Sequence, residues 1–108
     1  MIFGIGIDIV EINRIKKIDS LNKFAKKILS SNELKYLDNL NDSKKVYYLA
    51  KQFAGKEAFV KALGTGFKNP IFPKDIQILR NSFGQPEILL SDAAKSYIED
   101  LGITKTHV

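Results

Sequence analysis

The sequence predicts a single domain that mixes strands and helices, and three observations indicate this. An alternating segment opens the chain, a long segment with helical periodicity occupies its middle, and two short apolar runs flank a turn in its second half. A chain of 108 residues is long enough for one modest core and too short for two ordinary domains. We therefore expect one domain over residues 1–108, with neither an internal repeat nor a linker.

The first predicted element is a strand over residues 3–10. Large apolar side chains alternate there with small, acidic or branched ones, which is the period of two expected of a strand buried on one face. Asp8 then lies on the face that Gly4 and Gly6 leave bare. Aspartate is disfavoured in strands, and a buried carboxylate is costly unless it is paired or bound to a metal. Asp8 is therefore a candidate functional residue, with a structural ion pair as the alternative.

Three short helices are predicted to follow. Segments 11–18 and 21–29 both carry apolar residues at helical spacing. Ser30 followed by Glu33 is a capping-box pattern, and leucines spaced by three come after it, so a third helix is expected there. Residues 39–43 predict a polar turn.

The longest periodic segment, residues 44–63, predicts the main helix. One stripe of this helix consists of alanines, which permit close approach by another backbone or by a ligand: Ala50, Ala54, Ala58 and Ala62. Glu57 and Lys61 flank the stripe one turn apart, and segment 64–66 ends the helix. A glutamate four residues before a lysine is also the favoured arrangement of an ordinary exposed pair, so these two residues alone do not indicate a site.

The last third of the chain predicts a hairpin and a helix. Strands are expected over residues 75–80 and 87–90, around a turn at 81–86. Ser91 is expected to cap a helix over residues 92–101 that closes at Gly102. Residues 103–108 predict the start of a further strand.

Composition excludes several classes of site. The net charge of +5 favours an anionic partner, and the absence of cysteine excludes disulfides, thiolate zinc sites and thiol nucleophiles. His107, the only histidine, is more typical of a structural residue, and neither the P-loop nor the dinucleotide pattern is present.

No apolar run approaches the roughly 20 residues of a membrane span. Because a secretory signal is also absent, we expect a cytoplasmic location and no membrane partner.

Two segments together resemble the bacterial holo-acyl-carrier-protein synthases, a family of 4'-phosphopantetheinyl transferases. The first runs from Gly4 through Asp8 to Ile12 and Arg14, and the second is Phe53-Ala54-x-Lys56-Glu57-Ala58-Phe59-x-Lys61-Ala62-Leu63-Gly64-Thr65-Gly66. The similarity continues through Asp75-Ile76-x-Ile78 and Gly84-x-Pro86, so it covers nearly the whole chain in the expected order.

The resemblance implies an α+β fold, the 4'-phosphopantetheinyl transferase fold, with a small antiparallel sheet, one long helix and several short ones, assembled as a homotrimer. It implies transfer of the 4'-phosphopantetheine group from coenzyme A to a serine of apo-acyl carrier protein in fatty acid biosynthesis. Adenosine 3',5'-bisphosphate is the other product. Arg14 is expected to dock the carrier protein.

The same resemblance implies the site residues. Asp8 and Glu57 are expected to bind Mg²⁺, an ion that prefers one or two carboxylates, waters and substrate phosphates. Lys61 is expected to hold pyrophosphate charge, and Glu57 is the expected base for the serine proton, directly or through water. The coenzyme A site is expected to be lined by Lys56, Lys61, Gly64, Thr65 and Gly66.

Two departures from the family and two alternative functions remain. Family members continue past the position of Val108 with a final strand. We expect that this strand is missing from this chain. The alternative is a protein that is truly short. Many relatives have Gly-Arg where this chain has Lys51-Gln52, so phosphate contacts could pass to Lys44, Lys45 or Lys51.

The alternative functions are a non-catalytic basic module for an acidic protein or nucleic acid, and a transferase for another carrier. Because no stacking-aromatic RNA-binding motif is present, we expect no nucleic-acid partner.

Overall fold

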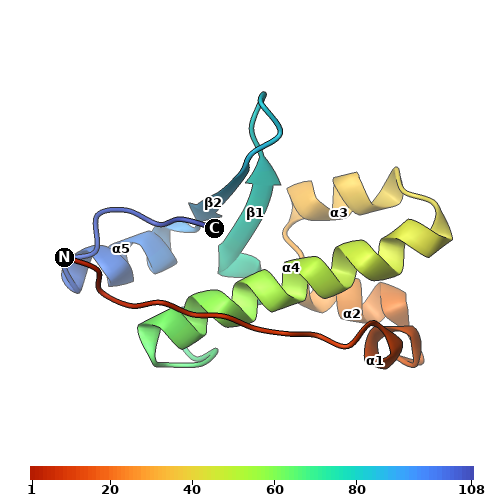
Figure 1. The fold of residues 1–108 in the computed structure, drawn as a ribbon, viewed down its shortest axis with the longest axis horizontal. Coiled ribbons are helices and arrows are strands. Elements are labelled where there is room, and N and C mark those ends of the chain that lie inside the picture. The colour runs from red at the N-terminus through yellow and green to blue at the C-terminus, as the bar shows by residue number, and fades with distance from the viewer.

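One long helix, α4 (Asp42–Leu63), runs through the middle of the molecule, and the other elements pack around it (Figure 1). The structure is a computed structural model that describes residues 1–108. Three short helices precede α4, and a 3-10 turn, two strands and a helix follow it. Their bounds are α1 (Ile12–Lys16), α2 (Leu21–Ile28), α3 (Ser31–Asp38), η1 (Pro73–Asp75), β1 (Ile76–Arg80), β2 (Pro86–Leu90) and α5 (Asp92–Asp100). The predicted α+β class is confirmed.

The helix starts form where the sequence places capping residues. Ser30 and Glu33 complete the predicted capping box at α3, and Ser91 accepts a hydrogen bond from the backbone N–H of Ala94 at α5. Asn41 caps α4, so this helix begins two residues before the predicted boundary. The helix ends at Gly64, whose left-handed φ of 77° suits glycine.

The predicted hairpin is confirmed. Strands β1 and β2 pair antiparallel from Ile76 opposite Leu90 to Arg80 opposite Pro86, and they form a two-stranded sheet. The turn between them is organised by the Asn81 side chain, which accepts hydrogen bonds from the backbone N–H groups of Phe83 and Gln85. The hairpin projects away from the helices (Figure 1).

The core consists of two apolar clusters that share α4. The first packs α1, α2 and α3 against the N-terminal half of α4, around Leu29 and Leu49. The second packs β1, β2 and α5 against the C-terminal half, around Val60 and Ile76. Burial on both sides therefore fixes α4 as the axis of the domain.

The predicted strand over residues 3–10 is wrong, and so is the predicted strand start at 103–108. Residues 1–11 are extended and run antiparallel to α4, but they carry no strand pairing (Figure 1). A strand requires a neighbouring backbone for its hydrogen-bond ladder, and residues 1–10 make no hydrogen bond between backbone groups. Ile5, Ile7 and Ile9 consequently point to solvent, with exposed fractions of 78%, 78% and 92%.

Candidate active site between the N-terminal segment and α4

The N-terminal segment, residues 1–11, lies directly against the alanine stripe of α4. A Cβ added at Gly4 would overlap the carbonyl oxygen of Ala62, and one added at Gly6 would overlap that of Ala58. Only glycine permits this approach, since any larger residue would force the two backbones apart. The prediction that the alanine stripe admits another backbone is confirmed.

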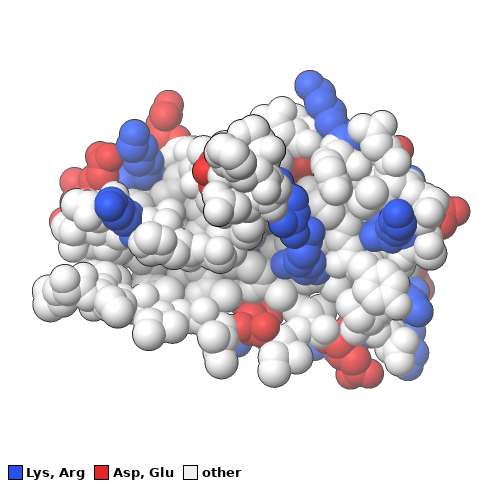
Figure 2. Space-filling model, turned by 45° about the horizontal axis from the view of Figure 1, so that its top comes forward, with Lys and Arg blue, Asp and Glu red and all other residues white.

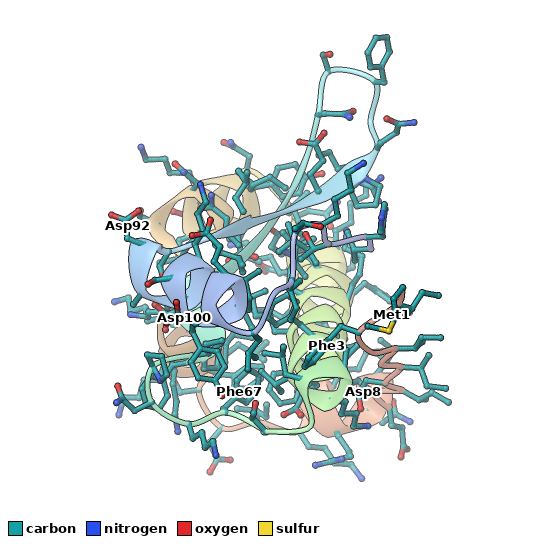
Figure 3. The ribbon with its side chains drawn as sticks, turned by 90° about the vertical axis from the view of Figure 1, so that its left-hand side faces the viewer. Met1, Phe3, Asp8, Phe67, Asp92 and Asp100 are labelled. Carbon is teal, nitrogen blue, oxygen red and sulfur yellow. The ribbon has the colours of Figure 1, made fainter.

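The same face of the N-terminal segment presents Asp8 to α4. The Lys61 ammonium donates a hydrogen bond of 2.7 Å to Asp8 Oδ1 and another of 3.3 Å to the carbonyl oxygen of Ile7. The Asp8 side chain is 13% exposed, whereas that of Lys61 is 52% exposed. The structure therefore brings together two of the predicted site residues, which lie 53 positions apart in the sequence. Figure 3, which looks along α4, shows Asp8 beside the helix.

Glu57 is partly buried on the same side of α4. It precedes Lys61 by one helical turn, and residues four apart on a helix are neighbours on its surface. Two ion pairs form in the structure, Lys61 with Asp8 and Lys56 with Glu33, and Glu57 belongs to neither. Its carboxylate is therefore not engaged by a protein cation.

The loop after α4 provides open backbone next to these side chains. Nothing lies within 4 Å of a Cβ built at Gly64 or at Gly66. The Thr65 hydroxyl donates to the carbonyl oxygen of Gly66 at 2.9 Å, which fixes its orientation. This loop can therefore approach a ligand by its backbone without a side chain in between.

Lys56 corrects the predicted coenzyme A site. Its side chain is fully buried, and its ammonium donates to Glu33 Oε1 at 2.7 Å and to the carbonyl oxygens of Pro73 and Ile76. Burial lowers the pKa of Lys56, and the Glu33 carboxylate opposes that shift. Lys56 points to the interior because it extends from α4 on the side of β1 and η1, so it does not line a coenzyme A site at the surface.

The buried partner of Lys56, Glu33, was assigned only to the capping box by sequence reasoning. Gln52 also faces this carboxylate, since it is 2% exposed and donates to Glu33 Oε2 and to the carbonyl oxygen of Ile78. Position 52 is therefore an interior position. The predicted transfer of phosphate contacts from position 52 to neighbouring lysines has no support in this geometry.

A groove of about 710 Å³ borders the site. It lies between residues 1–6, residues 102–108 and the C-terminal half of α4, and its lining is mostly apolar. Figure 2 shows the N-terminal segment as a largely uncharged strip at the lower left, whereas Lys and Arg side chains are scattered over the rest of this face. Arg14 is exposed on α1, at the opposite end of the N-terminal segment.

Comparison with known proteins decides the family. The family model of the 4'-phosphopantetheinyl transferase superfamily matches residues 4–105. The chain belongs to the 4'-phosphopantetheinyl transferase superfamily. The holo-[acyl-carrier-protein] synthase of Clostridium kluyveri is 46% identical over 109 residues, which cover 100% of this chain and 79% of the relative.

Solved structures of transferase relatives agree with this membership. A holo-[acyl-carrier-protein] synthase from Neisseria meningitidis superposes with a TM-score of 0.87 and 39% identity, covering 97% of this chain and 84% of the other. The Bacillus anthracis enzyme, solved in complex with CoA (3',5'-ADP), gives a TM-score of 0.78 and 42% identity, covering 84% and 77%. The predicted 4'-phosphopantetheinyl transferase fold is confirmed. None of the helices combines the length and the apolar content that a membrane span requires.

Proposed function

We propose that this chain is a holo-[acyl-carrier-protein] synthase, which transfers 4'-phosphopantetheine from coenzyme A to a serine of apo-acyl carrier protein. The observation that carries the proposal is the Asp8 carboxylate held against α4 by Lys61, which follows Glu57 by one helical turn. The serine oxygen forms a bond to the pantetheine-linked phosphorus, and the bond from that phosphorus to adenosine 3',5'-bisphosphate breaks. The reaction serves fatty acid biosynthesis, and we place it in the cytoplasm.

The carboxylates of Asp8 and Glu57 would hold Mg²⁺. The chain has no cluster of three or more His, Cys, Asp or Glu side chains, so its donors do not form a complete protein cage. Two carboxylates fit Mg²⁺, because this ion keeps several waters and binds substrate phosphates. When bound, Mg²⁺ supplies positive charge to the pyrophosphate oxygens on which negative charge develops.

The protein side chains position the reactants and move the proton. Lys61 is half-exposed beside Asp8, and its flexible ammonium would pair with pyrophosphate oxygens. Glu57 has no ion-pair partner and would accept the serine proton, directly or through water. The open backbone of residues 64–66 would line the coenzyme A site.

Features of the surface support the proposed partners and assembly. Arg14 is exposed, and the net charge of +5 favours an acidic carrier protein. The exposed isoleucines of the N-terminal segment form an apolar strip of a kind that marks interaction sites. This supports a homotrimer in which residues 1–108 act as one transferase domain.

The intact mass of the carrier tests the proposal. The chain is incubated with Mg²⁺, coenzyme A and apo-acyl carrier protein, beside Asp8→Asn, Glu57→Gln and the control Glu99→Gln, which alters an exposed carboxylate on α5. We expect the parent and the control to add one phosphopantetheine, and the two site variants to slow by about 10²-fold or more because each loses charge stabilisation. No mass gain with folded parent would contradict the transferase function.

A further inference from the structure

The buried cluster around Glu33 joins three parts of the fold through one carboxylate. Oε1 accepts hydrogen bonds from the Lys56 ammonium at 2.7 Å and from the Ser30 backbone N–H at 2.9 Å. Oε2 accepts from the Gln52 amide and from the Ile78 backbone N–H at 3.3 Å. Glu33 is completely buried, and no buried side-chain polar atom of the chain lacks a partner. One side chain therefore ties the start of α3 to both α4 and β1.

Lys56 extends the same cluster to η1 and to the start of β1. Its ammonium donates at 2.9 Å to the carbonyl oxygen of Pro73 and also to that of Ile76. The ammonium of a lysine has three N–H donors, and here each of them has an acceptor. A helix held by three such bonds in its interior face resists rotation about its own axis.

The direction of that face relates the cluster to the candidate active site. At about 100° per residue, Ala58 lies about 200° around the helix from Lys56, so the N-terminal segment crosses α4 opposite the buried ammonium. Glu57 and Lys61 lie about 100° and about 140° from Lys56, on the flank between the two faces. A roll of α4 would carry Glu57 and Lys61 along a circle relative to Asp8, which belongs to another segment.

We propose that Glu33 and Lys56 are positioning residues of the transferase, which fix the roll of α4 so that Glu57 and Lys61 meet Asp8. They touch neither substrate nor metal in this role, and they act through the helix. The inference rests on the proposed function, since it assigns the cluster to the same site. It gives the buried ion pair next to Glu57 a role in the geometry of the site, since a buried ion pair contributes little to stability compared with apolar packing.

The test uses Glu33→Gln, which keeps the shape of the side chain and removes its charge, and Lys56→Met, which removes the ammonium. Each variant is assayed at a temperature where circular dichroism finds it fully folded. We measure Mn²⁺ affinity by electron paramagnetic resonance with coenzyme A present and carrier absent, and then kcat and KM with carrier. We expect both variants to bind Mn²⁺ more weakly and to lose about 10- to 100-fold in kcat, as indirect supports of a site do. The KM for the carrier protein should be unchanged.

Leu37→Ala is the matched control. It empties part of the core beneath α3 and lowers stability without touching the polar cluster. It should retain the parent's Mn²⁺ affinity and kcat once folded. Parent-like values in folded Glu33→Gln would overturn the proposal and leave the pair a structural one.

The double variant Glu33→Gln/Lys56→Met keeps the proposal testable if Lys56→Met alone fails to fold, because it leaves no unpaired buried charge. Two residues that act as one unit should give non-additive losses, so the double variant should lose no more kcat than Glu33→Gln. A double variant with the parent's kcat would contradict a positioning role. Because Mn²⁺ affinity is measured without turnover, a parent that binds the metal but transfers nothing would contradict only the proposed function.

Discussion

At the scale of single residues, the Asp8 carboxylate is already paired with a cation of the protein. Lys61 lies 2.7 Å from Oδ1, in the position where the proposed divalent ion would bind. The Lys61 ammonium and a divalent ion would therefore compete for the negative charge of this carboxylate. Once released from Asp8, the Lys61 ammonium would be free to contact pyrophosphate.

We predict that Lys61→Gln tightens metal binding and impairs transfer. Without the competing ammonium, Mg²⁺ affinity in the absence of coenzyme A should rise by up to about fivefold, because a partly exposed ion pair contributes at most about 1 kcal/mol. Transfer to the carrier should fall, since pyrophosphate loses its cation. Calorimetric titration with Mg²⁺ measures the first effect, and weaker Mg²⁺ binding in the variant would contradict the competition.

A second residue-scale prediction concerns Tyr48. Burial raises the pKa of Tyr48 above 10.0, and the nearby Glu33 charge raises it further. Above about pH 10 the unfolded chain loses this proton while the folded chain keeps it, so the free energy of unfolding falls as pH rises, by at most about 1.4 kcal/mol per pH unit. Tyr48→Phe removes this contribution.

Urea unfolding of the parent and of Tyr48→Phe, at several pH values between about pH 9 and about pH 11.5, measures the contribution of Tyr48 to the free energy of unfolding. The loss of stability across this range should be smaller in Tyr48→Phe than in the parent. Tyr47→Phe, which changes a tyrosine that is 56% exposed, should behave like the parent. An identical loss in Tyr48→Phe would show that Tyr48 titrates normally.

At the scale of elements, the helices and the hairpin could be predicted because their signals are local. The capping box at Ser30, the cap at Ser91 and the alanine stripe of α4 each lie within a few residues of what they specify. The alternation over residues 3–10 correctly indicated an extended segment, but it did not indicate that the glycine face, and not the isoleucine face, turns to α4. It could not indicate whether a backbone lies beside that segment to pair with it.

The candidate site could be predicted only in part, for a related reason. Asp8, Glu57 and Lys61 carry family motifs, and the ion pair between Asp8 and Lys61 agrees with their grouping. Lys56 lies within the same motif but faces the opposite side of α4, toward Glu33. A short sequence motif does not indicate which face of its helix is buried. Glu33 was already explained locally as a capping residue, so its buried ion pair was not predicted.

The contact between the N-terminal segment and α4 gives a prediction at this scale. In Gly6→Ala the new Cβ would overlap the carbonyl oxygen of Ala58 and approach the backbone nitrogen of Ala62, and backbone atoms of a helix cannot turn aside, so the segment must move away. Transfer should fall by about 10²-fold, the cost of displacing a catalytic group by about 1 Å. Helix content by circular dichroism should be preserved, because α4 keeps its core contacts. Parent-like transfer by Gly6→Ala would contradict the need for this close approach.

At the scale of the whole molecule, the surface combines an exposed apolar segment with an excess of positive charge. The N-terminal segment exposes isoleucines, whereas Arg14 is exposed on α1. An excess of positive charge accelerates encounter with an acidic partner, and salt weakens this attraction by screening it. Carrier recognition should therefore depend on ionic strength more than the chemical step does.

We predict that Arg14→Ala raises the KM for acyl carrier protein at low salt by up to about fivefold, the range of an exposed charge. Added salt should raise the KM of the parent more steeply than that of the variant, with kcat little changed. Lys95→Ala removes the same charge from α5 and serves as the control. Equal salt dependence of KM in the parent and in Arg14→Ala would place carrier docking elsewhere.

The proposed metal site of Asp8 and Glu57 can be tested most directly by Mn²⁺ titration with coenzyme A present, followed by electron paramagnetic resonance. Asp8→Asn and Glu57→Gln should each weaken Mn²⁺ binding by about tenfold or more, since each removes a charged ligand, while Glu99→Gln should bind as the parent does. Unchanged Mn²⁺ affinity in either site variant would contradict a metal site shared by these two carboxylates.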